Sequence, residues 1–182
     1  MHYSVLVILP NGVKPDPADR EMVKRAVADL IERWRGKHFD WWQVGGRWTG
    51  VLSEYDPEKD ERNVETCRFC AGTGKRGDAI AALNPDQMKA LNGCNGCKGT
   101  GRELKWPTQW VPFEGDVQPT EKITPEMAKK FYTYVLPSPK KWRAWEGWNS
   151  RAKEFKEDKS WDILAVLKDH PGHYAVVVDT HN

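Results

Sequence analysis

The chain has 182 residues, a formal net charge of +2 and 10 tryptophans. This length suffices for one domain with its own apolar core, or for one domain that carries a small insertion. The weak positive charge argues against a protein that binds polyanions through bulk charge alone, because such proteins carry a larger excess of Lys and Arg. No stretch reaches the roughly 18 apolar residues that a membrane-spanning helix needs, so we expect no membrane partner.

The first two elements are the clearest in the sequence. Residues 3–9 form an apolar run that ends at Pro10, which predicts a buried strand. The run lacks the basic start and the small-residue cleavage site of a signal peptide. A helix is then predicted with Asp16 as its cap, Pro17 as its first residue and its end near Gly36. Its apolar residues recur at intervals of three and four and form one face: Met22, Val23, Ala26, Val27, Leu30, Ile31 and Trp34.

Caps, turns and apolar runs predict the later elements. These are a strand over 47–53 after the Gly45-Gly46 pair, a short helix beginning at 84–85, a helix over 124–134, a short helix within 140–159, and a hairpin of strands 162–168 and 173–179. We therefore predict an α+β fold, in which a mostly antiparallel sheet is covered by the long helix. Residues 1–60 and 105–182 would form this core, and residues 61–104 would form an inserted zinc module.

The cysteines carry the strongest functional signal. Residues 67–74 and 94–101 both have the form Cys-x-x-Cys-x-Gly-x-Gly. A spacing of two lets both sulfurs of a tight turn face one ion, and the glycines permit the positive φ angles that return the chain beneath it. Four thiolates at tetrahedral corners suit Zn²⁺ and leave no open coordination position, so we predict one structural zinc held by Cys67, Cys70, Cys94 and Cys97. Such paired cysteines without an export signal favour metal over disulfides and predict a cytoplasmic protein.

These two repeats resemble those of the cysteine-rich zinc domain of DnaJ-type co-chaperones. The resemblance covers residues 67–101 only. That family carries four repeats and two zinc ions, so two repeats imply a single zinc. The His-Pro-Asp motif of a J-domain is missing from the sequence, in which the nearest string is His170-Pro171-Gly172. The resemblance therefore implies the zinc fold and no co-chaperone function.

Two other segments combine aromatic and cationic residues. Trp41, Trp42, Arg47 and Trp48 surround the glycine pair and could form a stacking pocket for a base, with Arg47 on a phosphate. The alternative is that these tryptophans fill the core. A second set interleaves cations with aromatic rings, as single-strand or protein-contact surfaces do: Lys140, Lys141, Trp142, Arg143 and Trp145. Its alternative is an amphipathic helix that docks a tryptophan stripe on the sheet.

The histidines raise the question of catalysis. His170, His173, Asp179 and His181 lie close together in sequence, and His/Asp pairs can transfer protons. No glycine-rich phosphate loop or nucleophile elbow accompanies them. The sequence thus predicts a non-catalytic, zinc-containing protein that binds nucleic acid or a nucleoprotein complex, as a phage-type regulator or inhibitor would. The alternatives are a module that clamps an acidic protein and a hydrolytic enzyme that uses the C-terminal histidines.

Overall fold

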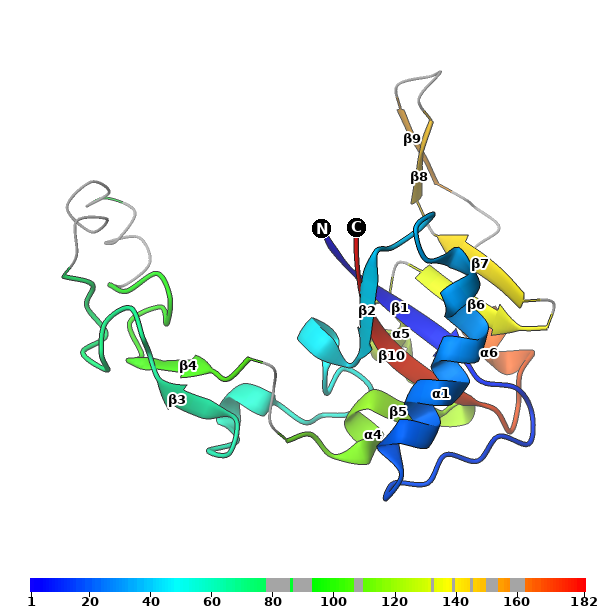
Figure 1. Cartoon of the computed structure of the whole chain (residues 1–182), viewed down its shortest axis with the longest axis horizontal. Coiled ribbons are helices and arrows are strands. Elements are labelled where there is room, and N and C mark those ends of the chain that lie inside the picture. Colours follow the sequence, from blue (N-terminus) through cyan, green and yellow to red (C-terminus); the bar gives the residue numbers. More distant parts are fainter. Residues whose placement is uncertain are drawn as a thin grey trace. The chain divides into compact units, whose positions relative to one another are not determined.

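The computed structural model describes residues 1–77, 86, 93–106, 110–131, 133–138, 140–144, 146–149, 154–157 and 163–182, with only the backbone given between 140 and 157. The chain divides into two compact units (Figure 1). Unit 1 comprises Met1–Tyr55 and Val111–Asn182, and unit 2 comprises Asp56–Trp110. The two units are described separately below.

Unit 1 contains most of the regular structure. Its strands are β1 (His2–Ile8), β2 (Trp41–Val44), β5 (Val117–Pro119), β6 (Thr133–Pro137), β7 (Lys140–Ala144), β8 (Glu146–Asn149), β9 (Glu154–Glu157) and β10 (Tyr174–His181). Its helices are α1 (Arg20–Ile31), α4 (Phe113–Asp116), α5 (Pro125–Ala128) and α6 (Ile163–Lys168), with 3₁₀ turns η1 (Glu32–Trp34), η2 (Gly46–Trp48) and η4 (Thr120–Lys122). Unit 2 has the 3₁₀ turn η3 (Pro57–Lys59) and strands β3 (Val64–Thr66) and β4 (Arg102–Leu104).

The main sheet is built around the pairing of β1 with β10, which lie side by side in Figure 1. Their antiparallel register runs from His2 opposite His181 to Ile8 opposite Ala175. The sheet has six strands in the order β2-β10-β1-β6-β7, with β5 also paired to β10. Only the contact between β1 and β6 is parallel. The predicted strands 3–9 and 173–179 and the mostly antiparallel sheet are confirmed.

The two faces of the central strands contribute to separate apolar clusters, because successive side chains of a strand point to opposite faces. Val5, Val7 and Leu9 of β1 belong to the first cluster, which also contains the buried residues of α1, namely Val23, Val27, Leu30 and Ile31. Leu6 and Ile8 belong to the second, together with Phe131 and Leu167. Two independent clusters give unit 1 enough apolar burial to fold without help from a metal.

Helix α1 begins three residues later than the sequence predicts. Asp19, and not Asp16, is the N-cap, and its carboxylate accepts a hydrogen bond from the Met22 backbone N–H at 2.9 Å. Asp16 instead accepts from the Ala18 N–H in a preceding turn. Both aspartates can accept hydrogen bonds from free N–H groups, and the N-cap is Asp19, which directly precedes the apolar face.

The predicted strand over 47–53 is wrong. Gly45 and Gly46 adopt φ angles of 71° and 58°, and the chain continues into η2 and tight turns. The polar groups of this segment are satisfied by a distant side chain, since the buried Asp116 carboxylate accepts from the Thr49 hydroxyl at 2.8 Å and the Gly50 N–H at 3.2 Å. Burial raises the pKa of Asp116 above its ordinary value, although these hydrogen bonds oppose that effect. A turn is therefore stabilised where local sequence favours a strand.

The predicted strand over 162–168 is also wrong, because residues 163–168 form helix α6 with Ile163 and Leu167 buried one turn apart. A short apolar run fits a buried helix and a buried strand equally well. The predicted helix over 124–134 is shorter than expected. Thr124 caps it as predicted, but α5 ends at Ala128 and residues 133–137 form β6.

The helix expected within 140–159 is replaced by strands β7, β8 and β9. Strand β7 pairs with β6, whose partner on the other side is β1. This segment therefore forms an edge strand of the main sheet. The short helix expected at 84–85 lies outside the described residues.

Candidate metal centre

Two tight turns in unit 2 bring the four cysteine sulfurs together. The Sγ atoms of Cys67 and Cys94 are 3.8 Å apart, and those of Cys70 and Cys97 are 3.7 Å apart. All four sulfurs lie within 4.8 Å of one another, and all four residues are buried. A disulfide would need a separation of about 2.05 Å. Four sulfurs at about 2.3 Å from a central zinc would instead be separated by about 3.8 Å, which fits the observed spacing.

The two turns, which we call the first knuckle (residues 67–74) and the second knuckle (residues 94–101), are related by approximate two-fold symmetry. Equivalent positions differ by 27 residues. Ala71 and Lys98 adopt φ angles of 48° and 50°, uncommon for residues with a Cβ. The Cys67 N–H donates to the Gly101 carbonyl at 2.9 Å, and the Cys94 N–H donates to the Gly74 carbonyl at 2.8 Å. Each knuckle therefore supports the other through the same hydrogen bond.

The last glycine of each repeat is required where the two backbones approach. A Cβ on Gly74 would lie 2.3 Å from the Gly99 carbonyl oxygen, and one on Gly101 would lie 2.3 Å from the Gly72 carbonyl oxygen. Both glycines also have positive φ angles, of 70° and 78°. The glycines of the repeat thus permit close contact between the two knuckles, in addition to the turn beneath the sulfurs.

Without a cation, the sulfurs differ in their tendency to ionise. Burial raises the pKa of Cys67 to about 12, despite hydrogen bonds from nearby N–H groups. Burial also acts on Cys97, but its contacts with the Gly101 N–H, Cys70 and Cys94 outweigh that effect and lower its pKa to about 7. The Gly101 N–H donates to the Cys97 sulfur at 3.2 Å. A metal would therefore bind with the release of protons, and its affinity would rise with pH.

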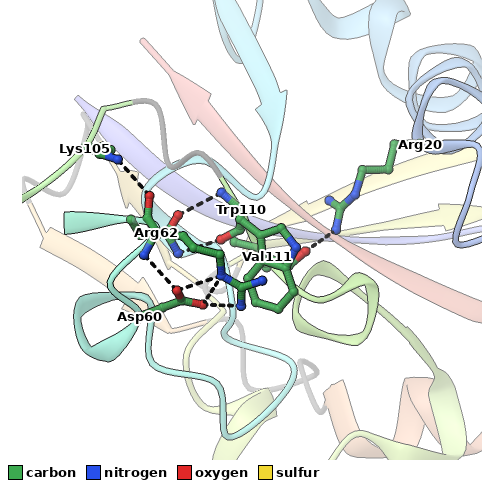
Figure 2. Close-up of polar contacts among 7 residues, drawn as sticks. Arg20, Asp60, Arg62, Lys105, Trp110 and Val111 are labelled. Carbon is green, nitrogen blue, oxygen red and sulfur yellow. Dashed lines mark hydrogen bonds and ion pairs between the residues drawn. The ribbon is translucent and has the colours of Figure 1, made fainter.

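The base of unit 2 is closed by polar contacts around Trp110 (Figure 2). The Asn63 side chain accepts from the Trp110 N–H at 2.8 Å and donates to the Trp110 carbonyl at 2.6 Å. The Arg62 guanidinium lies 3.3 Å from the centre of the Trp110 ring and donates to Asp60 (Figure 2). The Lys105 ammonium donates to the Arg62 carbonyl at 3.0 Å. These contacts tie the two ends of unit 2 together.

An exposed aromatic ring with two cations lies on the first knuckle. Phe69 is 41% exposed, and the guanidinium carbons of Arg68 and Arg76 each lie 4.9 Å from its ring centre. Its counterpart in the second knuckle is Gly96, where a Cβ would lie 2.3 Å from the Phe69 ring. The first knuckle therefore carries an aromatic ring that the second lacks, and both cations lie near this ring.

In unit 1, Trp41 and Trp42 line two adjoining grooves of about 410 and 450 Å³ between β2 and α1. Trp41 is 39% exposed, and Trp42 is half-buried with its indole N–H donating to Glu32 at 2.6 Å. Arg47 is exposed and lies outside both grooves, and Trp48 packs against the second apolar cluster. The structure therefore brings Trp41 and Trp42 together and separates them from Arg47 and Trp48.

The contact between Trp42 and Glu32 predicts a pH effect. Hydrogen bonds from Arg35 and Trp42 lower the pKa of Glu32 from 4.5 to about 2. Its stabilising contribution is complete above pH 4.5 and is lost as the pH falls toward 2. Because the pair is partly exposed, we expect Glu32→Gln to reduce stability by at most about 1 kcal/mol at neutral pH. Melting temperatures measured from pH 6 to pH 2.5 should converge for the two proteins. A difference that stays constant over this range would contradict the assignment.

The second predicted set lies on β7 and beyond. Lys140, Lys141, Trp142 and Arg143 belong to β7, whose side chains are not described, and Trp145 lies outside the described residues. The amphipathic helix given as the alternative for this segment is wrong for the described positions, since residues 140–144 and 146–149 are strands.

The C-terminal histidines form two groups and not one. The Nδ1 atoms of His170 and His173 contact the carbonyl oxygens of Val166 at 2.7 Å and Leu9 at 2.6 Å, with the rings 5.2 Å apart. His181 lies elsewhere, 3.0 Å from the Asp40 carboxylate, and Asp179 pairs with His2. Sequence reasoning did not include His2 among the candidate residues, because it lies directly before the predicted strand 3–9 and far in sequence from the other histidines.

No family model, curated protein or solved structure matches this chain. The likeness to DnaJ-type repeats therefore rests on the two cysteine motifs alone. Among the described residues, the four cysteines are the one group of three or more His, Cys, Asp or Glu side chains close enough to share a metal ion. Nor does any helix in the described ranges combine the length and apolar character that crossing a bilayer requires.

Proposed function

We propose that Cys67, Cys70, Cys94 and Cys97 bind one Zn²⁺ whose role is structural. The spacing of the sulfurs supports this proposal, since the separations of 3.8 and 3.7 Å match the edge of a zinc–thiolate tetrahedron. Four thiolates fill the coordination shell, so no position remains for a substrate or a catalytic water. Free thiols held for metal binding suit a reducing compartment such as the cytoplasm. Metal analysis of gently purified protein should find one zinc per chain.

We further propose that the zinc module presents a binding surface for nucleic acid. The observation that carries this is the exposed Phe69 ring with two arginine guanidinium groups 4.9 Å from its centre. Arginine forks bind phosphate oxygens well, and exposed aromatic rings stack on bases without regard to sequence. The Nε atom of Arg68 lies 3.7 Å from the Glu103 carboxylate. The Arg68 side chain is nevertheless 78% exposed, so its terminal N–H groups are accessible to a ligand. A role as a regulator or inhibitor of a nucleoprotein machine, of the kind that phages encode, fits such a surface.

The binding proposal predicts a defined loss in a double variant. We expect Arg68→Ala with Arg76→Ala to weaken binding of single-stranded RNA or DNA at least 10-fold. The plot of log affinity against log salt should become shallower by about 1.4, because roughly 0.7 counterions are released per phosphate contact on a single strand. Tryptophan fluorescence titrations with short single- and double-stranded DNA and RNA, at two or more salt concentrations, measure both quantities.

The matched control is Lys98→Ala, which removes one exposed cation from the second knuckle. Its backbone φ of 50° is tolerated by alanine, because the equivalent Ala71 has a φ of 48°. This variant should bind nearly as well as the parent protein. Binding that ignores salt, or an equal loss in both variants, would contradict the proposal. Either result would favour the alternative in which the zinc module binds an acidic protein.

A further inference from the structure

A row of three aromatic side chains crosses one end of the main sheet in unit 1. His2 of β1 is paired in register with His181 of β10, which is paired in turn with Trp41 of β2. The two imidazole rings are 5.0 Å apart, and the ring of His2 is 6.2 Å from that of Trp41. The side chains of His2 and His181 are 21% and 42% exposed. Two imidazoles and an indole are therefore accessible side by side.

Each imidazole is oriented by its own carboxylate. The Nδ1 atom of His2 lies 2.9 Å from Asp179, and the Nδ1 atom of His181 lies 3.0 Å from Asp40. An ionised carboxylate only accepts hydrogen bonds, so it favours the tautomer or cation with a proton on Nδ1. In the neutral ring this leaves Nε2 with a free lone pair. This is the arrangement by which aspartates prepare histidines for proton transfer.

The aspartate behind His2 is enclosed completely. Asp179 has no exposed surface, and its second oxygen accepts from the Arg47 backbone N–H at 3.0 Å. Gly46 packs so closely that a Cβ there would lie 2.4 Å from the Cβ of Asp179. Burying a carboxylate is costly unless its hydrogen bonds are satisfied. Here the enclosure holds His2 in one orientation at the surface of the protein.

No protein nucleophile is available among the described neighbours. Tyr3 of β1 is 40% exposed, but successive side chains of a strand point to opposite faces of the sheet, so Tyr3 points away from the face that carries His2. Ser4, on the same face as His2, is buried, and its hydroxyl donates to the Lys130 carbonyl at 2.7 Å. The Thr180 residue of β10 is buried as well. A reaction at this site would need a nucleophile that belongs to the substrate. RNA supplies one in the 2′-hydroxyl next to each phosphodiester bond, and the exposed ring of Trp41 offers a stacking surface for a base.

We propose that His2 and His181 form an acid–base pair that cleaves single-stranded RNA by internal transesterification. One neutral imidazole accepts the proton of the 2′-hydroxyl as this oxygen forms a bond to phosphorus. The bond between phosphorus and the 5′ oxygen breaks, and the other imidazole, which is protonated, donates its proton to the leaving oxygen. The products are a 2′,3′-cyclic phosphate and a 5′-hydroxyl end. Histidine suits both roles because its ordinary pKa lies near neutrality.

The test uses the full, zinc-loaded chain and a short single-stranded RNA that carries a fluorophore and a quencher, with DNA of the same sequence as a second substrate. We expect cleavage of the RNA, cyclic phosphate ends in the mass spectrum of the products, and no cleavage of the DNA. His2→Ala and His181→Ala should each lower kcat by roughly 100-fold or more. His170→Ala, which removes an imidazole outside the row, should leave kcat unchanged.

Asp40 is a positioning residue in this proposal. Its side chain is 65% exposed, so Asp40→Asn should not disturb folding, and it should lower kcat without changing KM. His181→Ala is equally safe for the fold, whereas His2→Ala leaves the buried Asp179 with only its hydrogen bond from the Arg47 backbone N–H among those described. Intact RNA after incubation with the parent protein, or full activity in His181→Ala, would overturn the proposal.

The choice of RNA as substrate rests on the proposed nucleic-acid binding, and the two proposals fail separately. Loss of binding in the Arg68 and Arg76 double variant would raise KM and leave the histidine chemistry intact. Binding without cleavage would support the first proposal and refute the second. Cleavage of DNA at the rate of RNA would also refute the second, because DNA lacks the 2′-hydroxyl.

Discussion

Replacement of Cys94 by serine is expected to release the metal and unfold unit 2, Asp56–Trp110, while unit 1 stays folded. The reason lies in what holds the described part of unit 2 together. Its one apolar cluster among the described residues consists of the four cysteines themselves. Removing one of these cysteines would therefore remove both the proposed zinc and the centre of the unit. Structural zinc in small domains contributes roughly 10–16 kcal/mol, which no other described contact in unit 2 can replace.

Limited proteolysis combined with metal analysis measures this result. In Cys94→Ser, or after treatment of the parent protein with a strong chelator, cleavage should concentrate between Asp56 and Trp110. The remaining segments should resist, since unit 1 has two apolar clusters of its own. Lys98→Ala, which changes the same knuckle without touching a ligand, should keep its zinc. A chelated protein that resists proteolysis as well as the loaded one would show that the metal does not stabilise unit 2.

Replacement of Gly46 by alanine is expected to have the second largest effect, and it acts on unit 1. Gly46 has a φ of +58°, and an added Cβ would lie 2.4 Å from the Cβ of Asp179 and 2.5 Å from its Oδ2 atom. The left-handed backbone costs about 1–2 kcal/mol for a residue with a Cβ. Overpacking against a buried side chain adds about 1–3 kcal/mol. We expect a total loss of roughly 2–5 kcal/mol in the free energy of unfolding.

Gly12→Ala is the matched control, because Gly12 has a φ of +85° but nothing within 4 Å of the added Cβ. Its free energy of unfolding should fall only by the cost of the left-handed backbone, about 1–2 kcal/mol. Chemical denaturation of both variants, followed by tryptophan fluorescence, compares the two costs directly. If they were equally destabilised, the contact between Gly46 and Asp179 would not be tight. Because Asp179 also orients His2, the Gly46 variant should lose the proposed RNA cleavage as well.

The sequence was sufficient for features whose physics is local. Residues 5–9 are all apolar and fully buried, and the short polar side chain of Ser4 is buried beside them, so a buried strand is the natural outcome. The Thr124 cap was predicted correctly because a hydroxyl before Pro125 satisfies free N–H groups wherever the helix ends. The spacing of Cys67 and Cys70 likewise sets the geometry of one turn. The gathering of all four sulfurs followed from repeating that turn.

Features that depend on a distant partner could not be predicted in the same way. The sequence predicts a strand over 47–53, but the Asp116 carboxylate satisfies polar groups of this segment in a turn. Residues 163–168 are apolar enough for either a strand or a helix, and only packing against the second cluster decides between them. The secondary-structure propensity of a short segment contributes little free energy, and burial of its apolar side chains outweighs it.

The sequence by itself thus determined a cluster of four cysteines whose spacing suits a metal ion, because two-residue spacing and glycine conformation act within a few residues of each sulfur. It also determined the two central strands and the apolar face of α1. Only the tertiary structure decided which side chains meet across the sheet. His2 and Asp179 are 177 positions apart, and the register of β1 against β10 brings them into contact. That register is set by the burial of whole strand faces, which no local pattern contains.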